Sequence, residues 1–294
     1  MINRNSLDIL GQFYFNIKES FKSIYQNSNF YEKKISKTFN NGFEYKPSPH
    51  LLSSIIKYQN KKFKIEDFAI DSIWQKSLNY KDYEKLNNFF WFFSLDLKSS
   101  KKTTQTVIKN WISNNSKYQK KSWEFDLTAK RIISWVSNHR LTYEDSDQEY
   151  RFSFDHMIQK QTNHLLNEIK NSKDVENKMI GCAAIILTGL TYKNEKQYLL
   201  NGLNLLKIII KSSIDNQGFP KSRNIRQLIF YLKYFIIIRE GFKESQSLIP
   251  EYIDETIFYL GSSYAFIWQN IKQDIFFNGN YSSENTEFDQ YLIT

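Results

Sequence analysis

Trp123-Glu-Phe-Asp-Leu-Thr-Ala-Lys-Arg-Ile-Ile-Ser-Trp135 is the stretch that decides the fold, because it reads as an amphipathic helix from its start. We expect Asp126 to cap this helix, since an aspartate side chain accepts a backbone hydrogen bond at a helix start. The apolar residues that follow form one stripe; they are Leu127, Ile132, Ile133, Trp135 and Val136. The stretch therefore predicts a helix with one face packed in a core.

The same helical spacing recurs on both sides of that stretch. It covers residues 1–40, 82–93, 107–112, 154–169, 179–190, 199–210, 226–239 and 250–271, the last opening with Pro250. The chain has only 9 glycines and 4 prolines, so it is poor in the residues that turns require. These features predict an all-α chain, built either as a helical solenoid or as a closed helical toroid.

Aromatic residues occupy many of the apolar positions, and we expect most of them in the core. The stripe in residues 1–40 consists of Ile9, Phe13, Ile17, Phe21 and Ile24. The stripe in residues 82–93 consists of Leu86, Phe89, Phe90 and Phe93, which predicts one helix. Residues 41–70 are different, since their Asn, Gly and Pro residues predict a loop with short extended pieces.

Composition excludes several classes of protein. At 41% hydrophobic residues the chain is too apolar to be disordered, and its single cysteine excludes an internal disulfide. Cys182 lies in an apolar run and is expected to be a buried structural thiol. No apolar leader follows Met1, and no run is long enough to cross a membrane, so no membrane insertion is expected. The native compartment is left open.

The net charge of +9 is typical of proteins that meet polyanions, such as nucleic acids, anionic lipids or acidic polysaccharides. A lysine-rich solvated surface gives the same number. The lysines are scattered along the chain and are not interleaved with aromatic residues in one cluster, so nucleic acid is not the expected partner. No glycine-rich nucleotide loop and no spacing typical of a metal site are present, so no cofactor and no metal are expected.

Several segments, in order, resemble the helical domain of heparinase II/III-like proteins, most of all a bacterial branch of that family. The stretch from Trp123 to Trp135 is similar to its Trp-x-x-Asp-x-x-x-x-Arg-x-x-x-Trp signature. Residues 108–115 resemble the segment before the signature, and residues 177–190 resemble the family's alanine-rich helix. The run Asp215-Asn-Gln-Gly-Phe-Pro-Lys-Ser-Arg-Asn224 resembles its Asp-Gly-Gly-His-x-x-Arg-Ser loop, and residues 275–280 resemble the end of its helical domain.

This resemblance implies an incomplete α/α toroid of helical hairpins over residues 81–294, preceded by a helical or irregular segment over residues 1–80. One continuous domain over residues 1–294 is the alternative. Family members add a C-terminal β-sandwich, which would begin near Thr294, so the chain is expected to be the N-terminal portion of a larger protein.

The resemblance also implies a polysaccharide lyase that cleaves uronic-acid polymers by β-elimination. Such a reaction needs a group that neutralises the uronate carboxylate, a base for the C5 proton and an acid for the leaving oxygen. Asn177, Arg223 and Asn224 match family positions for this chemistry, although Asn224 is equally suited to cap the next helix. The expected substrate contacts are Trp123, Arg131, Lys178 and Lys221.

The sequence departs from the family at the residues that would transfer protons. Phe219 replaces the loop histidine, and Gln227 falls near the family's tyrosine. Tyr231 and Tyr234 lie nearby, but on a helix whose apolar face is expected in the core. All four histidines, His50, His139, His156 and His164, are more typical of surface or internally bonded residues than of a base.

Three hypotheses follow from these departures. The first is a lyase for an acidic polysaccharide. The second is a module that binds an anionic glycan without cleaving it, with Trp74, Trp123 and Trp268 as residues that can stack on sugar rings. The third is a helical scaffold or nucleic-acid binder, which only the net charge suggests.

Overall fold

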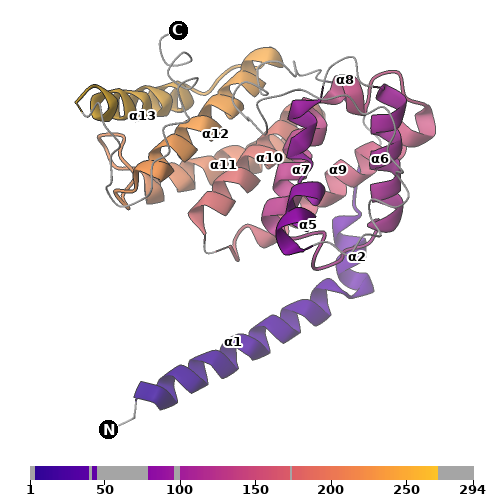
Figure 1. Ribbon diagram of the computed structural model, residues 1–294, viewed down its shortest axis with the longest axis horizontal. Helices are drawn as coiled ribbons and strands as arrows, with labels where there is room; N and C mark the ends of the chain where they lie inside the picture. The colour runs from indigo at the N-terminus through magenta and orange to yellow at the C-terminus, as the bar shows by residue number, and fades with distance from the viewer. Residues whose placement is uncertain (1–3, 40–41, 45–78, 96–99, 173, 271–294) are drawn as a thin grey trace.

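The computed structural model describes residues 4–39, 42–44, 79–95, 100–172 and 174–270 (Figure 1). Among these residues there is no β-strand, and the bridge between Ile214 and Pro220 is isolated, so the all-α prediction is confirmed. The helices are α1 (Arg4–Gln26), α2 (Asn29–Ile35), α5 (Tyr80–Asn87), the 3₁₀ helix η1 (Phe90–Ser94), α6 (Lys101–Asn114), α7 (Phe125–Ser137), α8 (His139–Thr142), α9 (Gln148–Glu168), α10 (Val175–Thr191), α11 (Lys196–Ser213), α12 (Ile225–Glu244) and α13 (Glu251–Asn270).

Three helices, α7, α10 and α12, form a layer in which all three begin at the same end. A Cβ added to Gly181, in the second turn of α10, would lie 2.5 Å from the ring of Phe125, the first residue of α7. At the other end, a Cβ on Gly241 of α12 would lie 2.7 Å from the Leu187 side chain. Glycine therefore lets these helices approach closely at both ends of α10.

A second group of helices packs against this layer. Helix α9 contacts α7 and α10, α11 contacts α10, and α13 contacts α12. The crossing of α10 and α11 is close, because a Cβ on Gly189 would lie 2.5 Å from the backbone nitrogen of Leu199. In Figure 1 the helices follow one another from α6 at one end of the body to α13 at the other.

The core contains many of the aromatic residues that the sequence predicted for it, but the prediction is wrong for the stripe of α1, whose Phe13 and Phe21 are exposed. Trp111, Trp135 and Phe89 are fully buried and meet edge to face, with the two indole centroids 5.5 Å apart. Cys182 is also fully buried, as expected, and donates through Sγ to the Gly202 carbonyl oxygen at 3.2 Å. Burial raises the pKa of this thiol well above its usual value, which makes it unreactive.

The prediction of one helix through Leu86 and Phe93 is wrong. Helix α5 ends at Asn87, Phe89 has a left-handed backbone with φ of 58°, and η1 begins at Phe90. The break frees carbonyl groups for other partners: the Phe89 oxygen accepts from Ser134 Oγ at 2.6 Å, and the Asn87 oxygen accepts from Arg131. These tertiary bonds replace the helical ones, so the apolar spacing alone could not reveal the break.

The predicted cap of α7 is also wrong by two positions. The helix begins at Phe125 with Glu124 at the cap position, and no side chain bonds the cap. Asp126 lies in the first turn, where it forms an ion pair with Lys130 at 3.0 Å. An acidic residue there still interacts favourably with the positive end of the helix dipole, which explains why the sequence signal was similar.

The segment that follows α2 is held along α9 by side-chain amides. Gln159 Oε1 accepts from the Phe39 backbone nitrogen at 2.7 Å, and its Nε2 donates to the Phe39 oxygen at 3.2 Å. Asn163 donates to the carbonyl oxygens of Ile35 and Lys37. The extended pieces predicted within residues 41–70, together with His50 and Trp74, lie almost entirely outside the described residues, as does the side chain of Trp268.

Candidate functional site

The loop between α11 and α12 is held rigidly. Asp215 Oδ1 accepts from the backbone nitrogens of Gln217 and Phe219 at 3.0 and 2.9 Å, and Ser263 Oγ of α13 donates to the Gln217 oxygen. Gly218 has φ of 81°, and a Cβ there would lie 2.5 Å from the backbone of Tyr259. Only glycine meets both conditions, so the Gly-Phe-Pro sequence fixes the loop against α13.

Arg223 closes the same loop. Its backbone φ is 58°, and its Nη1 lies 2.6 Å from Asp215 Oδ2. Partial burial would raise the pKa of Asp215, but the two backbone donors and Arg223 outweigh that effect and lower it. The guanidinium carbon also lies 5.9 Å from the Phe219 ring centroid, so Arg223 already has an anionic and an aromatic partner within the loop.

Asn224 caps α12. Its Oδ1 accepts from the Arg226 backbone nitrogen at 2.9 Å. This is the structural role that the sequence left open for Asn224, in which its side-chain oxygen accepts a backbone hydrogen bond.

A groove with a volume of about 860 Å³ opens between α11, the loop and α13. Three lysines line it, Lys207 and Lys211 from α11 and Lys221 from the loop, against two acidic residues, Asp215 and Glu255. Because Asp215 is already paired with Arg223, the groove has a surplus of positive charge. Lys221 Nζ donates to the Lys211 carbonyl oxygen at 2.7 Å and is exposed.

Two tyrosines of α13 form the other wall of this groove. The Lys207 ammonium lies 5.0 Å from the Tyr252 ring centroid, and the Tyr252 hydroxyl is buried. Tyr259 is exposed. Lys221 was predicted from the sequence, whereas Lys207, Lys211 and both tyrosines were not. The two lysines of α11 are four positions apart and the two tyrosines of α13 are seven apart, so each pair lies on one helix face.

Asn177 and Lys178 lie elsewhere. Both are half-buried in the first turn of α10, and neither is among the residues that line the groove, nor are Arg223 and Asn224. The expected single site containing Asn177, Arg223 and Asn224 is therefore not found at this groove.

Two predicted substrate contacts are core residues instead. Arg131 is fully buried, and its guanidinium donates to Gln161 Oε1, Thr128 Oγ1 and the carbonyl oxygens of Asn87 and Ser122. Burial lowers its pKa to about 9. These bonds use four of its five donors. The arginine of the sequence motif therefore connects α5, α7 and α9, and its guanidinium is not accessible to a substrate.

Trp123 has only 1% of its surface exposed, and its Nε1 donates to the Asn115 oxygen at 3.1 Å. Its ring packs edge to face with His164, whose own nitrogens bond Tyr31 and the Trp123 carbonyl oxygen. Burial lowers the pKa of His164 to about 3, so this histidine is neutral at ordinary pH. Neither ring is available to stack on a sugar.

The other proton-transfer candidates are buried or bonded within the fold. Tyr231 and Tyr234 are buried, and burial raises the pKa of each phenol, which disfavours the tyrosinate that a base requires. His156 Nδ1 lies 2.7 Å from Thr38 Oγ1, and burial lowers its pKa. His139 is buried with its ring stacked on Phe43.

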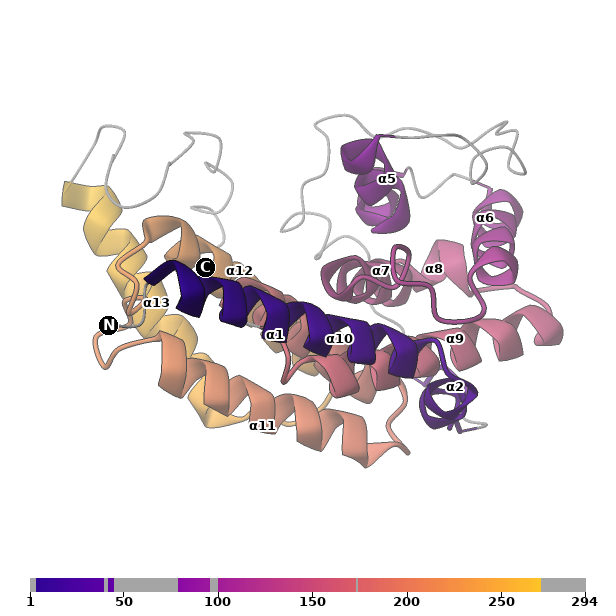
Figure 2. The same ribbon diagram turned by 90° about the horizontal axis from the view of Figure 1, so that it is seen from below.

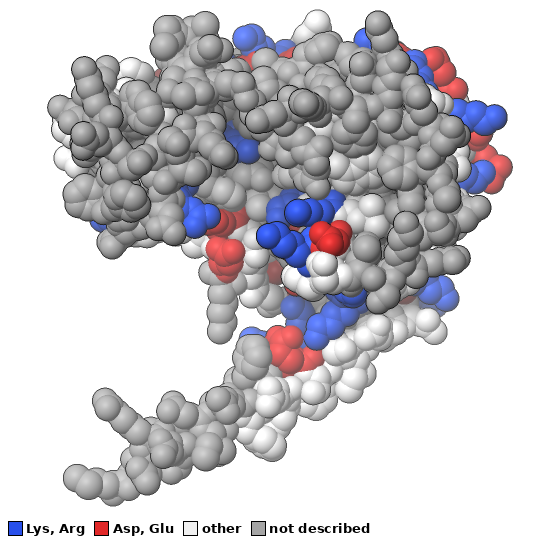
Figure 3. Space-filling view, viewed as in Figure 1, with Lys and Arg blue, Asp and Glu red and all other residues white. Residues whose placement is uncertain are grey.

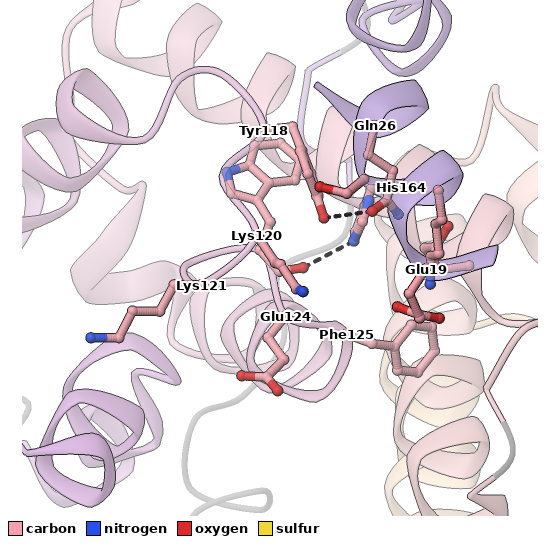
Figure 4. A pocket seen from close by; sticks show the side chains of 12 residues that line it. Glu19, Gln26, Tyr118, Lys120, Lys121, Glu124, Phe125 and His164 are labelled. Carbon is pink, nitrogen blue, oxygen red and sulfur yellow. Dashed lines mark hydrogen bonds and ion pairs between the residues drawn. The ribbon is translucent and has the colours of Figure 1, made fainter. Parts of the chain in front are cut away.

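A second cavity, of about 450 Å³, lies between the end of α1, the segment before α7, and α9. Figure 4 shows Tyr118 and Gln26 pointing toward one another across it, where the phenol donates to Gln26 Oε1 at 2.8 Å. Its three lysines, Lys22, Lys120 and Lys121, are matched by three glutamates, Glu19, Glu124 and Glu168. Without a surplus of either charge, this cavity is less suited to a polyanion than the groove at α13.

No protein-family model, curated protein or solved structure matches this chain. Within the described residues, no helix is both long and apolar enough to cross a membrane. The same part of the chain gathers no group of three or more metal-binding side chains.

Proposed function

We propose that this chain binds an acidic polysaccharide in the groove between α11, the loop and α13. The observation that carries the proposal is the surplus of lysine over carboxylate along one wall, opposite the tyrosines of the other. Uronate carboxylates attract ammonium groups, and the flat faces of sugar rings pack on aromatic side chains. A groove open to solvent suits a polymer, because a chain can enter from the side.

The rigid loop supports this proposal. Binding costs less free energy when the contacting groups are already held in position. Gly218 and Asp215 fix the backbone of the loop that carries Lys221. The Lys211 carbonyl oxygen accepts from the Lys221 ammonium and so orients it. The helix arrangement fits the same family resemblance: we propose that the layer of α7, α10 and α12, with α9, α11 and α13 packed on it, is an arc of an incomplete α/α toroid.

The binding test uses the full chain with acidic polymers such as polygalacturonate, alginate and heparin, and with neutral dextran. We expect the acidic polymers alone to bind, and salt to weaken the binding. The double variant Lys211→Glu, Lys221→Glu should lower affinity roughly tenfold or more, because it reverses two charges on the same wall. Calorimetry or immobilised-glycan binding measures both effects.

A matched control is available at the other end of the body. Lys102 and Lys109 are exposed on α6, far from α13 in Figure 1. The double variant Lys102→Glu, Lys109→Glu changes net charge equally and should retain affinity. Equal losses in the two double variants, or equally tight binding of single-stranded DNA, would show that only the overall charge is sensed and would refute a groove for glycans.

Cleavage by β-elimination is a second candidate, favoured by one observation at this groove. Tyr259 is an exposed phenol that lines the same groove as Lys221 and Asp215, where a base or an acid would meet a bound uronate. Lyase activity would release products that absorb in the ultraviolet. Tyr259→Phe should abolish that signal, while Tyr80→Phe, an exposed tyrosine on α5, should not. Absence of product from every bound polymer rejects cleavage and leaves binding intact.

A further inference from the structure

Helix α1 exposes its apolar stripe. The exposed fractions are 63% for Phe13, 39% for Ile17, 68% for Phe21 and 69% for Ile24. In Figure 1 the helix extends away from the body, and only its C-terminal end, next to α2, approaches the other helices. Side chains of this kind, repeated along one helix face, mark an interaction surface.

The opposite face of α1 is the one turned toward the body. Lys22 forms an ion pair with Glu168 of α9 at 2.5 Å, and Gln26 accepts from Tyr118. Glu19 and Ser23 line the cavity below them. At 3.6 residues per turn these positions lie across the helix from Ile17, so polar contacts fix α1 with its apolar face outward.

Figure 3 shows the same orientation on the molecular surface. In this view, the charged side chains along the described part of α1 lie on the side that faces the body, and the side chains on its lower edge are uncharged. An amphipathic helix normally turns its apolar face toward its own core, so the reversed orientation leaves the apolar face of α1 available to a partner.

The apolar stripe of α1 is symmetric about Ile17. In the sequence, Phe13 and Phe21 are each four positions from Ile17, and Leu10 and Ile24 are each seven positions from it. Two copies of this helix, placed antiparallel with Ile17 at the two-fold axis, therefore bring apolar positions opposite apolar positions throughout. Such self-complementarity is what a two-fold contact between identical chains requires, whereas a lipid surface requires none.

Charges fit the same register. With Ile17 at the axis, Lys18 comes opposite Asn16. Lys18 therefore meets no like charge, which would otherwise oppose the pairing. A helix of this length spans about 35 Å, so a full-length pair buries on the order of 1,000 Å², the lower limit for a specific interface.

We propose that α1 is a dimerisation helix that pairs antiparallel with α1 of a second copy about a two-fold axis at Ile17. The pairing covers Phe13, Phe21 and Ile24 in each copy.

The first experiment measures the mass of the full chain by analytical ultracentrifugation over a range of concentrations. Wild type should dimerise, and Ile17→Glu and Phe21→Glu should each weaken dimerisation roughly tenfold or more, because they place a charge in the apolar contact. Phe258→Glu on α13 is the matched control, since Phe258 is as exposed as Phe21, at 68%. It should dimerise like wild type. Circular dichroism confirms that each variant folds, as these residues are all on the surface.

Cysteine cross-linking tests the axis. Ile17→Cys should form an intermolecular disulfide readily, because the axis brings this position opposite itself. Phe13→Cys and Phe21→Cys should cross-link to each other in a mixture but poorly alone. The natural Cys182 is buried and does not compete.

Several results would overturn the proposal. One is a monomer at every concentration, and another is a dimer that persists in both Ile17→Glu and Phe21→Glu. Self-cross-linking of all three cysteine variants would mean parallel pairing. A monomer that binds phosphatidylserine vesicles, and loses this binding in Phe21→Glu, would identify a lipid surface as the occupant instead.

Discussion

Asp155 is a buried carboxyl group whose charge affects the stability of the fold. Its two oxygens accept from the Tyr143 and Tyr192 hydroxyls at 2.8 and 2.7 Å. Burial raises its pKa to about 6, although both tyrosines and Arg151 act in the opposite direction. The folded state therefore prefers the protonated form of this side chain.

This preference predicts a stability that falls as pH rises. In the unfolded chain Asp155 titrates near its ordinary pKa of 3.8, so between about pH 4 and pH 6 only the folded state keeps the proton. The stabilisation is complete below the unfolded pKa and is lost by about pH 6. A difference of about two pKa units corresponds to about 3 kcal/mol. Urea unfolding at a series of pH values measures it.

Asp155→Asn is the matched variant for that measurement. Asparagine keeps the shape and cannot ionise, so the difference in unfolding free energy between variant and wild type should change by about 3 kcal/mol across this window. The same difference at pH 4 and pH 7 would mean that Asp155 does not carry the effect.

Single residues were the least predictable part of this molecule. Arg131 sits in the helix that the sequence identified, but its partners Asn87 and Gln161 come from two other helices. A conspicuous arginine in a sequence motif is equally compatible with substrate binding and with a buried structural network. Only the tertiary partners decide between these roles, whereas the capping role of Asn224 needs only its immediate neighbours and was foreseen as an alternative.

At the scale of the elements, helix positions followed from local spacing and helix ends did not. Helix α10 and its neighbours were anticipated because apolar periodicity is a local signal. The break after Asn87 was missed because the groups that stabilise it, Ser134 and Arg131, are distant in sequence. The helical hydrogen bonds that are lost there are compensated by tertiary hydrogen bonds, which no local sequence pattern reveals.

The glycines of α10 and α12 provide a test of close helix packing. Gly189→Ala would place a Cβ 2.5 Å from backbone atoms of Leu199, which cannot move without shifting α11. Gly241→Ala would meet the flexible ends of two side chains, Leu187 at 2.7 Å and Leu190 at 3.3 Å. We expect Gly189→Ala to destabilise the fold by about 2 kcal/mol or more and Gly241→Ala to be nearly neutral, since alanine favours the helix by about 1 kcal/mol. Thermal unfolding compares them, and equal melting temperatures would contradict this packing.

At the scale of the whole molecule, the groove illustrates the limit of sequence reading. Its loop was identified from the run Asp215 to Asn224, because turn residues are conspicuous in a helical chain. Its walls were not, because Lys211 and Tyr252 lie 41 positions apart and meet only through the packing of α11 and α13 around the loop. All-α class followed from composition and spacing, whereas the path of the helices depends on close contacts at individual glycines.

The unequal packing of α10 and α1 leads to a prediction for native-state hydrogen exchange. Helix α10 contacts α7, α9, α11 and α12, so its amides from Met179 to Leu190 should exchange only through global unfolding. The first turns of α1 have no such support, and an isolated helix is marginal in water, so they should exchange roughly a hundredfold faster or more at low protein concentration. If α1 pairs with a second copy, its protection should rise with concentration in wild type and stay constant in Phe21→Glu. Equal protection of α1 and α10 in a monomeric sample would contradict the expected difference in exchange rates, because it would mean that contacts within the same chain protect α1.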